Sequence, residues 1–125
     1  MVKSIISALV AVLILFLGSF LEQKYVNDTF DEFKEMMVTV YKKVENDEAV
    51  KDDVLSAQTY WIEKKRILHT FIPHNEIKEI DLWLAESTTL VENDKKEDAL
   101  SKLDVVIELL EQIPKTFAFR IENVL

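Results

Sequence analysis

The sequence has no cysteine, one glycine and two prolines among its 125 residues. The absence of cysteine excludes disulfides, zinc–thiolate sites, thiol catalysis and a lipid-modified cysteine anchor, and it leaves the redox compartment open. So few turn-forming residues argue against a protein of many strands and tight hairpins. The one glycine, Gly18, lies in an apolar run, so the chain has no phosphate-cradling glycine loop and no nucleophile elbow. Classical nucleotide hydrolases and serine hydrolases are therefore excluded.

Positive charge is in deficit after residue 21. All 23 acidic residues follow Leu21, together with 14 of the 15 basic ones, which leaves residues 22–125 with a formal net charge of −9. Phosphate backbones and anionic lipid head groups repel such a domain. We therefore expect no nucleic-acid partner.

Charge of either sign is absent from Ser4 to Leu21, a run of 18 residues. As a helix this run is about 27 Å long, close to the ~30 Å hydrocarbon core of a bilayer. We predict a membrane anchor over residues 1–25 and one helical domain over residues 26–125. A cleaved signal peptide and a buried helix of a soluble protein are the alternatives.

The residues near the end of this run favour an anchor that is not cleaved. Signal cleavage requires small residues two positions apart in the sequence. The residue two positions before Gly18 is Phe16, and the residue two positions before Ser19 is Leu17, so neither site has the required pair. Lys3 supplies positive charge on the short N-terminal side of the run, so the N-terminus is predicted to stay in the cytoplasm and the domain to lie outside the membrane.

The rest of the chain predicts an all-α fold, because apolar residues recur at helical spacing in four segments. The first helix is expected to begin at the capping residues 27–29 and to end near Asn46. The second ends before Pro73, and the third is expected to have His74 or Asn75 as its N-cap and to end near residues 92–94. The fourth is expected to open with a capping box formed by Asp94 and Glu97. The predicted inner faces consist of Val26, Phe30, Phe33, Met37, Val40, Val44, Val50, Val54, Ala57, Trp61, Leu68, Phe71, Ile77, Ile80, Leu84, Val91, Ala99, Leu100, Leu103, Val106, Ile107, Leu110 and Ile113.

Short polar breaks between these helices favour an antiparallel four-helix bundle-like domain behind the transmembrane helix. An open, curved array of helix pairs is the alternative arrangement. The apolar tail after Pro114 is expected to fold back onto the helices.

Several short motifs carry a family resemblance: the helix led by Trp61 with Leu68, the turn at residues 73–76, the acidic break before Ala99 and the ending at residues 121–125. In these features the chain resembles the domain-of-unknown-function 4363 family. The resemblance implies a small membrane-anchored helical protein of spore-forming Gram-positive bacteria. It implies no assigned activity and carries no catalytic residue over.

No residue constellation predicts catalysis, a cofactor or a metal. His69 and His74 are five residues apart and do not share a helical face, as a metal-binding pair at i, i+4 would. A di-iron bundle needs Glu-x-x-His motifs, but Arg66 and Phe71 stand three residues before the two histidines. The many carboxylates fall mostly off the apolar stripes, as is typical of a solvated face. We therefore expect a protein that is not an enzyme.

Apolar residues beyond the needs of one helix stripe predict a partner surface. Trp83 lies beside its stripe, in contrast to Trp61, whose place within a stripe predicts the core. The candidate surface residues are Trp83, Val105, Leu109, Phe117, Phe119 and Ile121.

Two classes of function remain. The first is a membrane-anchored interaction module, an accessory or scaffold for another membrane or envelope protein. The alternative is a sensor whose bundle encloses a small apolar molecule or lipid, which would need an apolar cavity of several hundred Å³.

Overall fold

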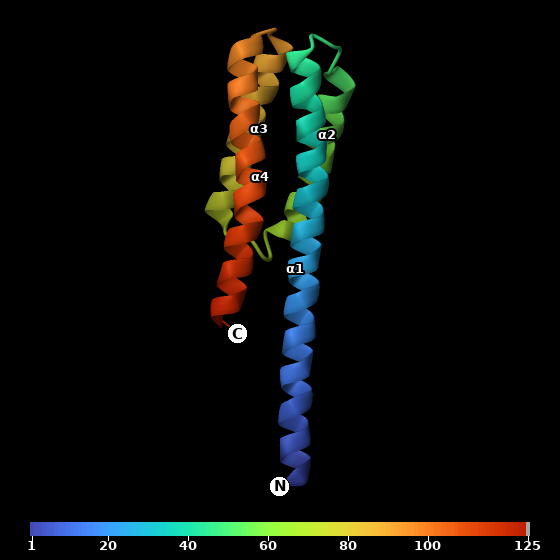
Figure 1. The fold of residues 1–125 in the computed structure, drawn as a ribbon, viewed down its shortest axis with the longest axis vertical. Coiled ribbons are helices and arrows are strands. Elements are labelled where there is room, and N and C mark those ends of the chain that lie inside the picture. Colours follow the sequence, from blue (N-terminus) through green and yellow to red (C-terminus); the bar gives the residue numbers. More distant parts are fainter. Residues whose placement is uncertain (125) are drawn as a thin grey trace.

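The computed structural model describes residues 1–124, and every regular element in that range is a helix. The helices are α1 (Val2–Glu45), α2 (Lys51–Leu68), α3 (His74–Glu92) and α4 (Lys96–Val124). Figure 1 shows that the N-terminal part of α1 projects beyond the other three helices, which pack alongside its second half. The prediction of an all-helical fold with a long apolar first helix is confirmed.

Helix α1 is continuous over 44 residues, so the prediction of a new helix beginning at residues 27–29 is wrong. Thr29 is buried instead of capping a helix. No proline or glycine lies between Gly18 and Asn46, so nothing in the local sequence breaks the helix. One rigid element therefore joins the exposed apolar segment to the folded part of the chain.

The core consists of one inner stripe from each helix. On α1 the buried positions alternate at spacings of four and three residues, which keeps them on one helix face. The stripe of α4 has the same spacing from Ala99 to Phe117. Most of the predicted inner positions are confirmed as buried: Val26, Phe30, Phe33, Met37, Val40, Val44, Val54, Ala57, Trp61, Leu68, Ile77, Ile80, Leu84, Ala99, Leu103, Val106, Leu110 and Ile113. Five others that were predicted to face inward are only half-buried against the core: Val50, Phe71, Val91, Leu100 and Ile107.

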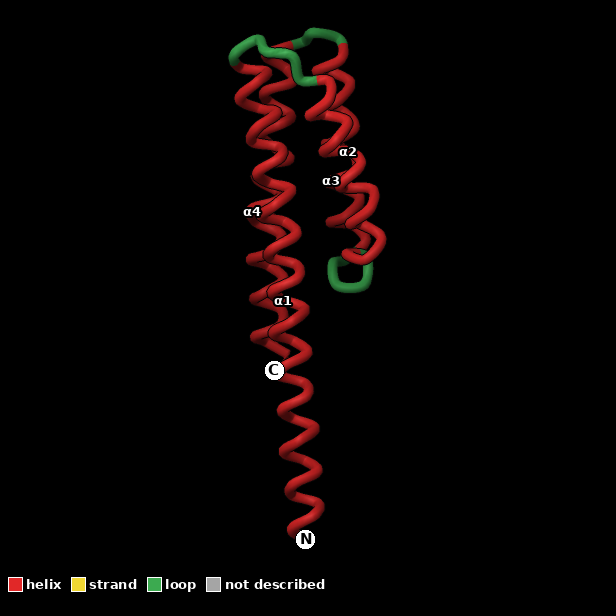
Figure 2. Tube along the Cα trace, turned by 90° about the vertical axis from the view of Figure 1, so that its right-hand side faces the viewer, coloured by secondary structure: helices red, strands yellow, loops and turns green. Residues whose placement is uncertain are grey.

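Each helix packs against its neighbours in sequence, and α4 also packs along α1. Figures 1 and 2 show α4 running back along the second half of α1, with the α2–α3 turn on the side nearer the N-terminus. The α1–α2 and α3–α4 turns lie together at the opposite end. We call this the far end of the domain.

Helix α4 runs through Pro114 to Val124, so the tail packs on the other helices as predicted, but as a continuation of α4 and not by folding back. Proline lacks an amide hydrogen and loses one intrahelical hydrogen bond. Phe117 nevertheless continues the stripe formed by Leu110 and Ile113 and is 5% exposed. Its burial keeps the last turns of α4 aligned with the rest of the helix.

Two turns at the far end have the same sequence. Residues 44–47 and residues 91–94 both read Val-Glu-Asn-Asp. Asp47 and Asp94 are the non-glycine residues with positive φ, at 57° and 55°. The left-handed region is sparsely occupied by residues other than glycine, although aspartate tolerates it better than most.

Backbone hydrogen bonds show why these aspartates take that conformation. The Glu48 amide donates to the Lys43 carbonyl at 2.8 Å, and the Lys95 amide donates to the Leu90 carbonyl at 2.9 Å. Bonds of this span close a Schellman motif, which requires a left-handed residue just after the helix. Asp94 therefore ends α3, and the predicted capping box that would open α4 is wrong.

The α2–α3 turn also differs from its prediction. Pro73 is the N-cap residue of α3 and makes no side-chain capping bond, whereas His74 or Asn75 was expected there. The φ of Pro73 is −55°, so its fixed ring geometry sets the direction in which α3 begins.

We expect Asp47→Gly and Asp94→Gly each to raise the free energy of unfolding by about 0.5–1 kcal/mol, because glycine occupies the left-handed region without a Cβ clash. Denaturant unfolding followed by circular dichroism measures the change.

Asn93→Gly is the matched control for Asp94→Gly, because Asn93 lies in the same turn at φ −92°. This control should lower stability or leave it unchanged. A gain for Asn93→Gly equal to that for Asp94→Gly would show that the left-handed conformation is not the cause.

Candidate functional site

The first part of α1 is a candidate membrane segment. It is long and apolar enough to cross a membrane by length and composition, and none of its most apolar 18-residue window is buried. A signal sequence at the N-terminus would have the same length and composition. The complete exposure of the window means that it is not a core helix of this fold. Val26 is the first fully buried residue of the chain.

The interior of the domain is filled. The apolar void between the helices measures about 10 Å³, about the room that one water molecule needs. Its lining consists of Met37, Val40, Val54, Ala57, Leu84, Thr88, Val91 and Leu103. A small apolar molecule needs several hundred Å³. The core therefore offers no ligand chamber of that size.

Trp61 belongs to the core, as its position in the stripe predicts. Its ring stacks on Phe33 with 5.3 Å between centroids, and the side chain is 2% exposed. The indole Nε1 donates to Asp81 at 2.6 Å, and Lys65 also reaches this carboxylate at 3.3 Å. The polar edge of the indole is thus satisfied between α2 and α3.

Aromatic rings join three elements at the end of the domain nearer the apolar segment. The Phe71 ring lies 6.2 Å from the Tyr25 ring and 6.4 Å from the Phe117 ring. Nearby, Arg120 Nη2 donates to both carboxylate oxygens of Glu76, at 2.9 and 3.0 Å. These contacts hold the last turns of α4 against α1, the α2–α3 turn and the start of α3.

The six predicted surface residues lie in different surroundings in the structure. Phe117 lies in the core, and Ile121 is half-buried against it, so these two side chains mainly hold α4 in place. Phe119 points away from the core and is 64% exposed. Trp83 is half-buried, and the Lys102 ammonium lies 4.7 Å from its ring centroid. This is a cation–π contact between α3 and α4.

The remaining two predicted residues, Val105 and Leu109, lie one helical turn apart on α4. Both are half-buried, and with Asp104 and Glu108 they line a shallow, open hollow. Because the tail continues as a straight helix, it does not cover this part of α4. These four residues, Asp104, Val105, Glu108 and Leu109, form one strip along α4 that borders the hollow, with two apolar and two acidic side chains. We call this strip the α4 ridge.

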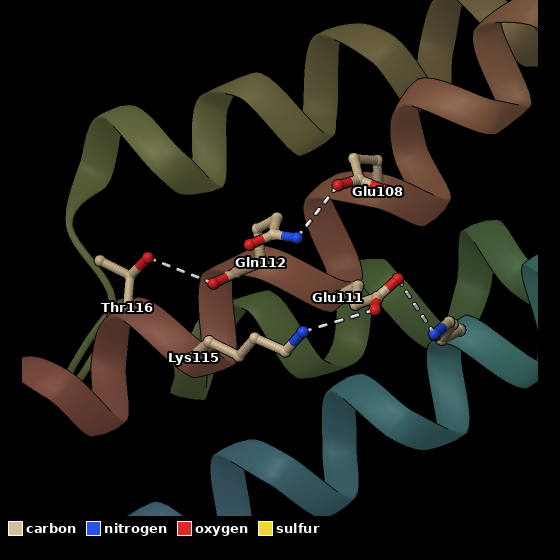
Figure 3. A network of polar contacts seen from close by, with 6 residues as sticks. Glu108, Glu111, Gln112, Lys115 and Thr116 are labelled. Carbon is tan, nitrogen blue, oxygen red and sulfur yellow. Dashed lines mark hydrogen bonds and ion pairs between the residues drawn. The ribbon is translucent and has the colours of Figure 1, made fainter.

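Next to the ridge, an ion network ties α4 to α1 (Figure 3). Glu111 lies 3.6 Å from Lys34 and 3.4 Å from Lys115. The charge of Lys34, and then the hydrogen bond from Lys115, lower the pKa of the Glu111 carboxyl below its ordinary value. Glu108 accepts a bond from Gln112 at 3.0 Å.

A larger hollow of about 550 Å³ lies at the far end, open to solvent. It has an apolar floor and an acidic rim. Its lining consists of Glu48, Ala49, Val50, Lys51, Val54, Leu55, Val91, Glu92 and Asp94. The prediction from sequence missed this site, although the repeated Val-Glu-Asn-Asp tetrapeptide was a visible sign that the two turns are alike.

The two histidines lie closer together than their spacing indicated. The His69 and His74 rings stack with 5.5 Å between centroids, because the turn between them reverses the chain. The two histidines do not share a helical face, as predicted, since His69 follows α2 and His74 begins α3, but this does not keep their rings apart. Within residues 1–124, no group of three or more histidine, cysteine or carboxylate ligands is placed to hold a metal ion.

These features define a class: an all-helical domain with a filled core, carried on a helix whose first part is apolar and exposed. Residues 20–124 match the family described as Domain of unknown function (DUF4363). The chain belongs to this family, as its motifs indicated. No curated protein and no solved structure shows a significant match.

We expect Glu111→Gln to lower the free energy of unfolding at neutral pH. A carboxyl with a lowered pKa stabilises the fold above its ordinary pKa of 4.5, and this stabilisation is lost as the pH falls through the lowered value. The difference between the variant and the parent should therefore shrink below about pH 4.5. Denaturant unfolding across pH 3 to 7 measures it.

Glu97→Gln on the same helix is the control, because Glu97 is exposed and makes no ion pair within the part of the chain described. A pH-independent loss of stability in Glu111→Gln would contradict the ion-network explanation and indicate a packing defect.

Proposed function

We propose that this protein is a membrane-anchored, non-catalytic interaction module that serves another membrane or envelope protein as an accessory or scaffold. The observation that carries the proposal is the division of α1 into two parts. Its apolar window is wholly exposed, whereas its second half supplies one stripe of a filled core. A single helix thus offers one surface suited to lipid and another suited to protein.

The proposed topology has residues 1–25 as an uncleaved single-pass anchor and residues 26–125 outside the cell membrane. Lys3 favours a cytoplasmic N-terminus. The acidic domain would avoid the anionic lipids of the inner leaflet. We also propose that the relatives of this protein are membrane-anchored proteins of spore-forming Gram-positive bacteria.

An antiparallel four-helix bundle is the proposed architecture of the domain. The packing of α1 against α4 supports it, because an open array would leave its first and last helices apart. The alternating spacings of three and four residues on α1 and α4 are also typical of bundle packing.

The α4 ridge is the proposed docking surface. Val105 and Leu109 present apolar area, and Asp104 and Glu108 beside them favour a partner with basic residues flanking its own apolar stripe. An amphipathic helix of this kind could bind weakly and still be held, because two proteins in one membrane meet at high effective concentration.

A ligand-binding sensor is the second candidate. The void of about 10 Å³ in the core speaks against a ligand enclosed by the helices. The open hollow of about 550 Å³ at the far end supports this second candidate, because it is large enough for a small molecule.

The anchor can be tested with single cysteines, since the chain has none of its own. We expect Glu97→Cys to react with a membrane-impermeant maleimide in intact cells, and the protein to stay in the membrane after alkaline carbonate washing. A protein released by carbonate, or a cysteine labelled only after lysis, would contradict the proposed topology.

The docking surface is tested by Leu109→Glu in the full chain, with Leu82→Glu as the control at an exposed position on α3. We expect Leu109→Glu to abolish crosslinking to the partner recovered with the parent protein, at unchanged helicity. Leu82→Glu should keep the crosslink.

Two results would count against the ridge. One is that Leu109→Glu unfolds the protein while Val105→Lys, which adds a positive charge between the two acids of the ridge, leaves the crosslink intact. The other is that crosslinking in mild detergent recovers nothing but the chain itself.

A further inference from the structure

Helix α4 reaches further toward the N-terminal end of α1 than the α2–α3 turn does. Both views show this, with the C-terminal end of α4 beside the exposed part of α1 (Figures 1 and 2).

Ring contacts set the register between the two helices. Phe71 touches both Tyr25 on α1 and Phe117 on α4, so Tyr25 and Phe117 lie near one level. The helices run in opposite directions, so a residue two positions beyond Phe117 lies about 3 Å closer to the N-terminal end. Phe119 therefore lies near the level of Glu22 and Gln23, where the uncharged run ends.

Phe119 is unlike the aromatic residues around it. Tyr25 and Phe71 are partly buried against the core and Phe117 is buried, but Phe119 is 64% exposed. The adjacent cation, Arg120, is paired with Glu76. Its charge is thus offset within the domain, which leaves an exposed aromatic ring beside the end of the proposed membrane span.

From this register we infer that Phe119 inserts into the interfacial layer of the outer leaflet and gives the domain a second contact with the lipid. Aromatic rings favour this layer, where apolar and polar surroundings meet. The inference rests on the proposed anchor, since the span sets the depth of Phe119. A second contact away from the axis of α1 would fix the tilt of the domain.

The test uses the full chain reconstituted in neutral phosphatidylcholine vesicles, with Phe119→Cys labelled by the environment-sensitive fluorophore NBD. Leu82→Cys is the matched control, because Leu82 is 62% exposed and lies well inside α3. Leu55→Cys at the start of α2 reports on the far end. Flotation of the vesicles and quenching by nitroxide-labelled lipids are measured on the same samples.

We expect all three proteins to float with the vesicles. Emission from position 119 should shift to the blue and be quenched by nitroxide lipids, while positions 82 and 55 should match labelled protein in water. If the proteins float and position 119 behaves like position 82, the lipid contact is refuted and the anchor stands. A blue shift without quenching by nitroxide lipids would mean that a second copy of the chain, and not lipid, surrounds position 119. This result would also refute the lipid contact. Failure to float would overturn the anchor and this inference together.

Discussion

The continuity of α1 is the constraint on which the rest of the structure depends. One uninterrupted helix carries an apolar window with no buried residue and, from Val26 onward, one stripe of the core. A rotation of the helix that exposed the stripe would also rotate the window, because a helix without proline or glycine between the two parts transmits torsion. The orientation of the domain is therefore coupled to the orientation of its first segment.

Helix α4 packs along the second half of α1 and supplies the matching stripe of the core. Its stripe matches that of α1 in spacing, and the burial of Phe117 and Ile113 on both sides of Pro114 keeps the helix straight where a hydrogen bond is missing. At the far end, a chain poor in glycine turns by placing Asp47 and Asp94 in the left-handed region. The strain energy of those two turns is small compared with the free energy gained by burying apolar area between the aligned helices.

Periodicity was sufficient to predict the inner faces, because burial of an apolar stripe is what makes these helices stable. Local polar signals were less reliable. Residues 27–29 can cap a helix, yet tertiary packing of Val26 and Phe30 favours continuing it, and Asp94 closes a helix where it was expected to open one. The position of Phe119 beside the end of the apolar run depends on the register of α1 against α4, which no local pattern of one helix contains.

The filled core and the exposed features together indicate where binding can occur. A void of about 10 Å³ leaves no room inside for a drug-sized ligand, so the proposed partner would be recognised by the surfaces of the domain. The α4 ridge is small and partly acidic, which in free solution would give only a weak contact. A domain held at a fixed height and tilt loses less orientational freedom on docking than a freely diffusing one. If Phe119 and the anchor both contact the lipid, the ridge is presented to neighbouring membrane proteins in one orientation, and a modest surface is enough.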